Sequence, residues 1–244
     1  RPAATIKEFL DLLVARFEGY GGELRFRCPV RRIVREGERV VGVRLADGTE
    51  ITAEAVLSTA GIPATAELAD WPLDRAAYSG RMSFMETITL VPRALRLELR
   101  SDRTIIFFSR RERFSYRRPL EPLDPSWGVI CFPENFQGLP PADPFQVRVT
   151  NAANYDLWKA AGPEEYARLK EEWGERSADQ VRKIIGNYQR NRVYEDRFTP
   201  VTIERFTAKA WGAVYGSPIK IKDGRTPYAN LFIAGTDQGY LGIV

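Results

Sequence analysis

The stretch Leu231–Val244 reads LFIAGTDQGYLGIV, and it bears on both fold and function more than any other part of the chain. Its first four residues are apolar and predict a short buried strand. Gly235 breaks this strand just ahead of a carboxylate, Asp237, and small residues after a buried strand let a ligand approach the backbone closely. The closing Gly242-Ile243-Val244 predicts the start of a helix whose N-terminal amides would face an electron-rich group.

The composition excludes several kinds of active site. The chain has 244 residues, 44% of them hydrophobic and 28% charged, which is typical of a globular protein. It contains only Cys28 and Cys131 as cysteines and no histidine. This excludes zinc sites of the usual Cys/His kinds and the Ser-His-Asp and Cys-His nucleophile systems, and it argues against a disulfide framework. We expect no metal site and a reducing, cytoplasmic location, with peripheral membrane contact as an open alternative.

The chain also lacks any apolar run of about 18 residues, so no membrane-spanning segment is expected. It begins at Arg1 and ends inside the glycine-rich stretch, so we interpret it as an interior fragment of a longer protein.

The N-terminal part predicts one helix followed by a series of short strands. Thr5 and Glu8 have the spacing of a capping box, and apolar residues recur at helical spacing up to Tyr20, before Gly21-Gly22. Turn signals at Glu36-Gly37 and Asp47-Gly48 indicate a meander. The predicted strands are 24–28, 30–34, 40–45, 51–53 and 55–59, the last ending in Thr59-Ala60-Gly61.

Taken together, the two ends of the chain resemble the FAD-dependent oxidoreductases of the phytoene desaturase, carotenoid isomerase and retinol saturase group, within the amine-oxidase-like flavoprotein superfamily. The resemblance rests on the order helix, Gly-Gly-Glu, meander and strand in the first part, and on strand, glycine, acid and Gly-Ile at the end. It implies FAD as the cofactor. It also implies that the backbone at Val30 contacts adenine, that Thr59, Ala60 and Gly61 close over the nucleotide, and that Asp237 hydrogen-bonds the ribityl or pyrophosphate part. Gly235, Thr236, Gly242 and Ile243 would complete the cofactor site, with the last two facing the isoalloxazine.

One part of the family pattern is missing from the chain. The fingerprint GxGxxG is absent, because Gly19, Gly21 and Gly22 follow a predicted helix rather than a strand. The fragment alone is therefore expected to bind FAD weakly or not at all and to be inactive. No side chain can be named as catalytic, since the flavin itself carries hydride chemistry.

The middle of the chain predicts a second domain. Strand character appears at 84–91, 95–99, 104–109, 127–132 and 145–150, and helical spacing begins after Asn154. The predicted fold is α/β: part of a discontinuous FAD-binding, Rossmann-like domain with an inserted α+β substrate domain. The expected limits are 1–61 and 201–244 for the FAD-binding parts and 62–200 for the substrate-binding part.

The resemblance also implies where the substrate lies. The stretch from Gly212 to Gly216 would approach the flavin, with Tyr215 and Gly212 beside the substrate and Phe84, Phe107 and Phe132 lining an apolar channel. Ordinary core packing, with a strand and turn at 199–216, is the alternative. The expected reaction is desaturation, saturation or isomerisation at carbon–carbon bonds of an apolar, isoprenoid or carotenoid-like small molecule. An amine or protoporphyrinogen-type flavin oxidase and a non-catalytic module without flavin remain alternatives.

A basic and aromatic segment stands out from the scattered charge of the rest. Five arginines and two aromatic residues occupy positions 110–118. The pattern is compatible with a solvated hairpin tip or with contact to anionic lipid headgroups, and a nucleic-acid partner is not expected. The arginines are Arg110, Arg111, Arg113, Arg117 and Arg118, and the aromatic residues are Phe114 and Tyr116.

Overall fold

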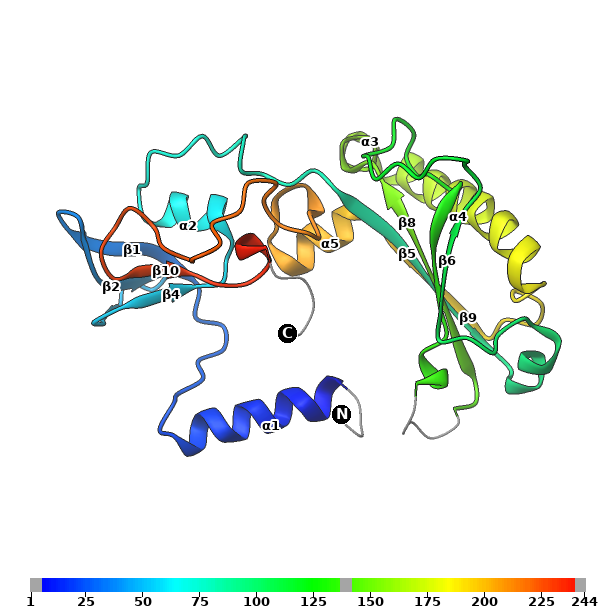
Figure 1. Ribbon diagram of the computed structural model, residues 1–244, viewed down its shortest axis with the longest axis horizontal. Helices are drawn as coiled ribbons and strands as arrows, with labels where there is room; N and C mark the ends of the chain where they lie inside the picture. Colours follow the sequence, from blue (N-terminus) through cyan, green and yellow to red (C-terminus); the bar gives the residue numbers. More distant parts are fainter. Residues whose placement is uncertain (1–5, 137–141, 240–244) are drawn as a thin grey trace. The chain divides into compact units, whose positions relative to one another are not determined.

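A computed structural model describes residues 6–136 and 142–239 and divides the chain into two compact units (Figure 1). Unit 1 comprises residues 1–22 and 81–212, and unit 2 comprises residues 23–80 and 213–244. The boundaries between the two units thus lie after residues 22, 80 and 212. The expected domain limits lay after residues 61 and 200. The assignment of FAD and substrate binding to 1–61, 62–200 and 201–244 stays a prediction.

Unit 2 contains an antiparallel meander close to the predicted one. Its turns at Gly37 and Gly48 have φ of 60° and 90°, a backbone region that favours glycine. The predicted strand at 24–28 does not form, and in the described part of the chain this segment pairs with no strand. Arg27 has a left-handed φ of 56°, which is incompatible with an extended strand. The strands are β1 (Val30–Glu36), β2 (Arg39–Leu45) and β3 (Glu50–Thr52).

The second sheet of unit 2 joins segments that are far apart in the sequence. β4 (Val56–Ser58) pairs in parallel with β10 (Leu231–Ile233), and the helix α2 (Ile62–Leu68) follows β4. The predicted final strand therefore forms as β10. A short 3-10 helix, η4 (Thr236–Gln238), follows it. The core of unit 2 consists of Ile33, Val40, Ala69, Tyr228 and Leu231.

Unit 1 is built on a five-stranded antiparallel sheet in the order β6-β7-β8-β5-β9. The segment expected as a strand at 95–99 instead belongs to a 3-10 helix, η1 (Arg93–Glu98), which starts directly after Pro92. The edge strand β9 was not predicted. The strands are β5 (Ser83–Val91), β6 (Ile105–Ser109), β7 (Trp127–Cys131), β8 (Phe145–Ala153) and β9 (Tyr194–Phe198).

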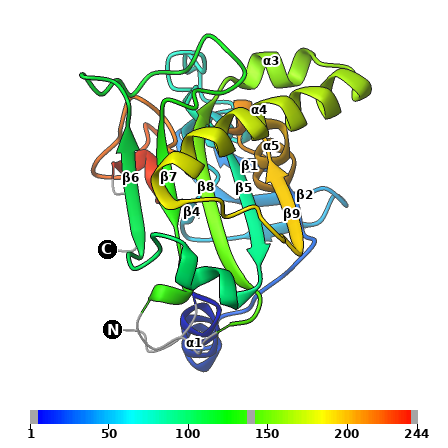
Figure 2. The ribbon, with the colours of Figure 1, turned by 90° about the vertical axis from the view of Figure 1, so that its right-hand side faces the viewer.

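One long helix covers one face of this sheet. α4 (Pro163–Ile185) lies across β7, β8 and β5 in Figure 2, and its apolar residues pack on alternate residues of the strands. β5 alternates strictly between buried and half-buried positions, as expected for a sheet with two different faces. The core on the α4 side includes Val91, Ile130, Phe132, Val147, Val149, Val181 and Ile185.

Capping residues set the starts of the shorter helices of unit 1. Asn154 accepts a hydrogen bond from the Asp156 amide and starts α3 (Tyr155–Ala160). Thr199 and Thr202 form a reciprocal capping box at the start of α5 (Pro200–Thr207), so this segment is a helix where a strand and turn was the alternative expectation.

The remaining elements are α1 (Ile6–Gly19), close to the predicted 6–20, η2 (Pro133–Asn135) and η3 (Ala210–Gly212).

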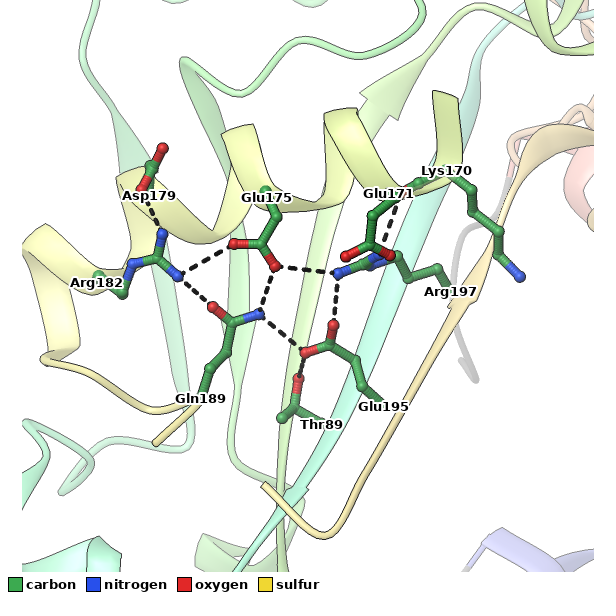
Figure 3. Close-up of polar contacts among 9 residues, drawn as sticks. All are labelled: Thr89, Lys170, Glu171, Glu175, Asp179, Arg182, Gln189, Glu195 and Arg197. Carbon is green, nitrogen blue, oxygen red and sulfur yellow. Dashed lines mark hydrogen bonds and ion pairs between the residues drawn. The ribbon is translucent and has the colours of Figure 1, made fainter. Parts of the chain in front are cut away.

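A buried ion-pair network holds β9 against α4 (Figure 3). The Arg197 side chain is only 7% exposed and donates to Glu171 on α4 and to Glu195 on its own strand. The second oxygen of Glu195 accepts from Thr89 of β5, at 2.9 Å, and from Gln189, at 3.0 Å. The network therefore connects the helix, the edge strand and the strand next to it.

Gly174 makes room for this network. A Cβ atom at Gly174 would lie 2.3 Å from Nε and 2.4 Å from Cζ of Arg197. We therefore expect Gly174→Ala to lower the free energy of unfolding by about 1–3 kcal/mol, despite the better helix propensity of alanine, because Arg197 must shift out of its buried site. Chemical denaturation measures the difference. Gly162→Ala is the control, since a Cβ there meets no atom within 4 Å. Equal stability of the two variants would contradict this account.

Candidate functional site

The strongest candidate site lies in unit 2, at the carboxyl ends of two parallel strands. Thr59 and Ala60 follow β4, while Gly235 and Thr236 follow β10 after Ala234. The Ala234 amide donates to the Ser58 carbonyl at 3.0 Å, which holds the two strand ends side by side. In open α/β sheets, ligands bind beyond the carboxyl ends of the strands. The structure thus brings four of the predicted cofactor-binding residues to one edge, the β4–β10 edge.

The backbone at this edge is accessible. Thr59, Ala60 and Gly235 are all exposed. Gly235 has φ of 107°, and a Cβ there would project into open space, with no atom within 4 Å. A planar or phosphate-bearing group can therefore approach the Gly235 backbone without a side chain in the way. These features fit a bound dinucleotide.

Asp237, in contrast, turns into the protein. Its residue exposure is 3%, and both of its carboxylate oxygens accept hydrogen bonds from backbone amides. Oδ2 accepts from Ile62 at the start of α2, at 2.5 Å, and Oδ1 accepts from Ser217, at 2.8 Å. Asp237 therefore braces the two loops that flank the β4–β10 edge. The expected hydrogen bond from Asp237 to FAD stays a prediction.

Two further residues, Gly216 and Lys220, support this brace. A Cβ at Gly216 would lie 2.0 Å from Oδ1 of Asp237, so glycine is required for the carboxylate to reach the Ser217 amide. Lys220 donates from Nζ to the carbonyls of Tyr215 and Thr236, each at 2.8 Å. A single lysine in a loop gives no recognisable sequence signal, so this cation beside the edge could be found only from the structure.

The other predicted cofactor-binding residues are not at the described edge. Val30 begins β1, opposite Leu45, and so belongs to the meander rather than to the parallel pair. Gly242 and Ile243 lie outside the described residues.

The second face of the five-stranded sheet, opposite α4, is the candidate substrate surface in unit 1. Strand pairing places Phe107, Val129, Thr150, Glu86 and Phe198 in one row across this face. A neighbouring row consists of Ile105, Cys131, Arg148, Ile88 and Asp196. Phe84 and Trp127 lie farther along the same face, where their rings meet edge to face with centroids 6.4 Å apart.

The predicted channel residues do not form one wall. Phe84 and Phe107 share the second face, but Phe132 is 1% exposed and packs in the core on the α4 side. The expected position of Phe132 beside Phe107 is therefore wrong. Gly212 belongs to unit 1, where its carbonyl accepts from Ser83 at 2.7 Å, whereas Tyr215 belongs to unit 2.

The second face carries charge as well as apolar side chains. Arg148 donates from Nε to Glu86 at 2.5 Å. Asp196 adds a second carboxylate, which forms an ion pair with Lys170 of α4 at 3.7 Å. Burial raises the pKa of the neighbouring Cys131 thiol, although Arg148 works in the opposite direction. The thiol is therefore neutral near pH 7 and unsuited to nucleophilic work.

The described residues contain neither a cluster of metal ligands nor a helix that could span a membrane. Residues 6–136 and 142–239 contain no group of three or more side chains placed to hold a metal ion. Within the same ranges, no helix has both the length and the apolar character needed to cross a membrane.

Solved structures share the fold of the chain at low sequence identity. An oxidoreductase from Methanosarcina mazei matches with a TM-score of 0.55 and 15% identity, over 95% of this chain and 49% of that one. FqzB matches with a TM-score of 0.50 and 12% identity, over 93% and 45%. Cyclohexylamine oxidase from Brevibacterium oxydans has a TM-score of 0.46 and 17% identity, over 86% and 42%. The chain thus spans about half the length of these structures. No curated protein matches it.

A family comparison agrees with the geometry of the β4–β10 edge. The match is to the family described as flavin containing amine oxidoreductase, and it extends over residues 5–244. This confirms the expected FAD cofactor and the expected α/β fold class, and it does not distinguish the phytoene desaturase group within the superfamily. The chain belongs to the flavin containing amine oxidoreductase family.

Proposed function

We propose that the protein containing this chain is an FAD-dependent oxidoreductase to which unit 2 contributes part of the FAD site. The observation that carries the proposal is the β4–β10 edge, where two strand ends meet beside the exposed backbone of Gly235. When bound, the flavin would take up two electrons and a proton from a substrate that is oxidised, or return them to a substrate that is saturated.

Within this proposal, each part of the chain has a separate task. The backbone of Thr59, Ala60, Gly235 and Thr236 holds the cofactor, and Asp237 fixes the loops on either side. Val30 would contact the adenine end. The contact of Gly242 and Ile243 with the isoalloxazine stays a prediction, because both residues lie outside the described ones. No side chain of this chain is assigned to proton transfer.

We further propose that the substrate lies on the second face of the five-stranded sheet. Its apolar side chains, including Ile105, Phe107 and Val129, favour a largely apolar molecule such as an isoprenoid. The reaction would then be desaturation, saturation or isomerisation at carbon–carbon bonds.

A specific observation favours a second substrate class. The family that the chain matches is described as flavin containing amine oxidoreductase, and Glu86 places a carboxylate on this face beside Arg148. A carboxylate on this face can pair with a protonated amine, which would be oxidised at its carbon–nitrogen bond.

Flavin reduction distinguishes these substrates. The purified full-length protein is expected to show the visible absorption bands of oxidised flavin. Under anaerobic conditions, loss of these bands with phytoene supports a desaturase, and loss with cyclohexylamine supports an amine oxidase. A full-length protein that purifies without flavin, and takes up none when FAD is added, would support a non-catalytic module and contradict the proposal.

The cofactor edge can be tested separately from the substrate. Gly235→Ala in the full-length protein is expected to weaken FAD retention by about fivefold to a hundredfold, the range that corresponds to overpacking by 1–3 kcal/mol. Gly48→Ala is a matched control, because Gly48 also has a positive φ and open space beside it but lies in the meander turn. Fluorescence of released flavin, measured after equilibrium dialysis, gives the affinity. Equal FAD affinity of the two variants would remove Gly235 from the site.

A further inference from the structure

The segment Arg110–Leu120, which follows β6, concentrates the net positive charge of the chain. It contains five arginines and one glutamate, so its net charge is +5 − 1 = +4. The whole chain also has a formal net charge of +4, and the remaining residues therefore sum to zero. A local excess of this kind creates a positive surface potential that attracts an anionic partner.

Two of the five arginines fasten the segment to the rest of unit 1. Arg111 pairs with Asp124 at 2.8 Å, and Arg118 pairs with Asp156 of α3. The other three, Arg110, Arg113 and Arg117, are exposed and form no ion pair within residues 6–136 and 142–239. The ion pairs therefore hold the segment near both ends and leave three guanidinium groups for an external anion.

Large apolar side chains are exposed on the same segment. Leu120 is 92% exposed and Phe114 is 60% exposed. The Phe114 ring meets the Trp127 ring edge to face, with centroids 5.1 Å apart, so it is supported from one side and accessible from the other. Arginines beside an exposed leucine and aromatic rings are the combination found where proteins rest on a lipid headgroup layer.

We propose that the Arg110–Leu120 segment docks on the surface of a bilayer that contains anionic phospholipids. Arg110, Arg113 and Arg117 contact the phosphate groups, while Leu120 and Phe114 enter the headgroup layer. An acidic protein would match the charge but would leave these apolar side chains without a function at the contact. A nucleic acid would match the charge with its phosphates and could stack bases on the rings, but it has no counterpart for Leu120. The proposal is independent of the cofactor and substrate assignments.

Vesicle co-sedimentation of the full-length protein tests the proposal. Binding is expected to vesicles of phosphatidylcholine mixed with phosphatidylglycerol, to be weaker for pure phosphatidylcholine, and to fall as salt is added. The triple variant Arg110→Gln, Arg113→Gln, Arg117→Gln should lose on the order of a hundredfold in partitioning, at about fivefold for each charge. Leu120→Ser should weaken binding at every salt concentration, because it removes the uncharged part of the interaction.

A second triple variant provides the control. Arg39→Gln, Arg192→Gln and Lys222→Gln remove the same charge from exposed positions elsewhere and should leave partitioning close to that of the unchanged protein. An equal loss in both triple variants would show attraction by total charge alone and would overturn the proposal. So would an absence of binding to the mixed vesicles, or binding to single-stranded RNA that competes with vesicles and depends on the same arginines.

Discussion

Asp237→Ala is expected to lower the free energy of unfolding by about 3–5 kcal/mol, even when no flavin is bound. The substitution removes two hydrogen bonds to a charged acceptor, each worth about 1.5–3 kcal/mol. It also leaves the amides of Ile62 and Ser217 without an acceptor in a buried setting. The effect arises from the protein itself, because Asp237 connects the start of α2, the Ser217 loop and the end of β10.

Denaturation of the flavin-free, full-length protein measures this effect. Asp223→Ala is the control, since Asp223 lies in the same unit but is exposed, and among the described residues it accepts only from the Arg225 amide. Asp237→Asn provides a milder variant, because one carbonyl oxygen remains while the new amide group faces a backbone donor. An Asp237→Ala protein with unchanged flavin-free stability and reduced FAD affinity would instead assign the residue to direct cofactor binding.

The residue Asp237 also illustrates what the sequence could and could not predict about the site. The glycines and the acid after an apolar run predicted the strand β10 and a ligand edge, because these signals are local. The direction of the carboxylate depends on Ile62, which is 175 residues away, and on Ser217, which is 20 residues away. No local pattern contains that information, so the bracing role of Asp237 could be found only from the structure, and its contact with FAD stays a prediction.

The fold shows the same division between local and tertiary signals. The helix α1 and the meander turns were predicted from caps, periodicity and Gly37 and Gly48, which act within a few residues. The capping box at Thr199 and Thr202 is equally local, but it has Thr202 in place of the Glu or Gln of the usual signature, so the sequence does not predict α5.

The edge strand β9 could not be found in this way, because it reads YEDRF and has three charged residues in its centre. These charges are accommodated only because α4 supplies partners for Arg197 and β5 supplies one for Glu195.

That dependence gives the second large expected effect. Arg197→Met should lower the free energy of unfolding by about 3–5 kcal/mol, the range for breaking a buried ion pair by removing one partner. Methionine fills much of the space of the arginine stem, so the loss is mainly electrostatic. Glu195, whose side chain is 8% exposed, would keep its charge without the guanidinium that balances it. Its bonds to Thr89 and Gln189 are too few to compensate (Figure 3).

A matched control lies on the same helix. Arg168 pairs with Glu165 and Glu172, but its own side chain is 60% exposed, and Arg168→Met should change stability by no more than about 0.5–1 kcal/mol. The double variant Arg197→Met, Glu195→Leu should recover much of the loss, because both charges leave the interior together. If Arg197→Met were no more destabilising than Arg168→Met, β9 would be held by its backbone pairing with β5 alone. If the double variant recovered nothing, the lost contact with α4 would be the cause of the instability. Recovery in the double variant would instead show that the unbalanced Glu195 charge, rather than a lost contact with α4, causes the instability.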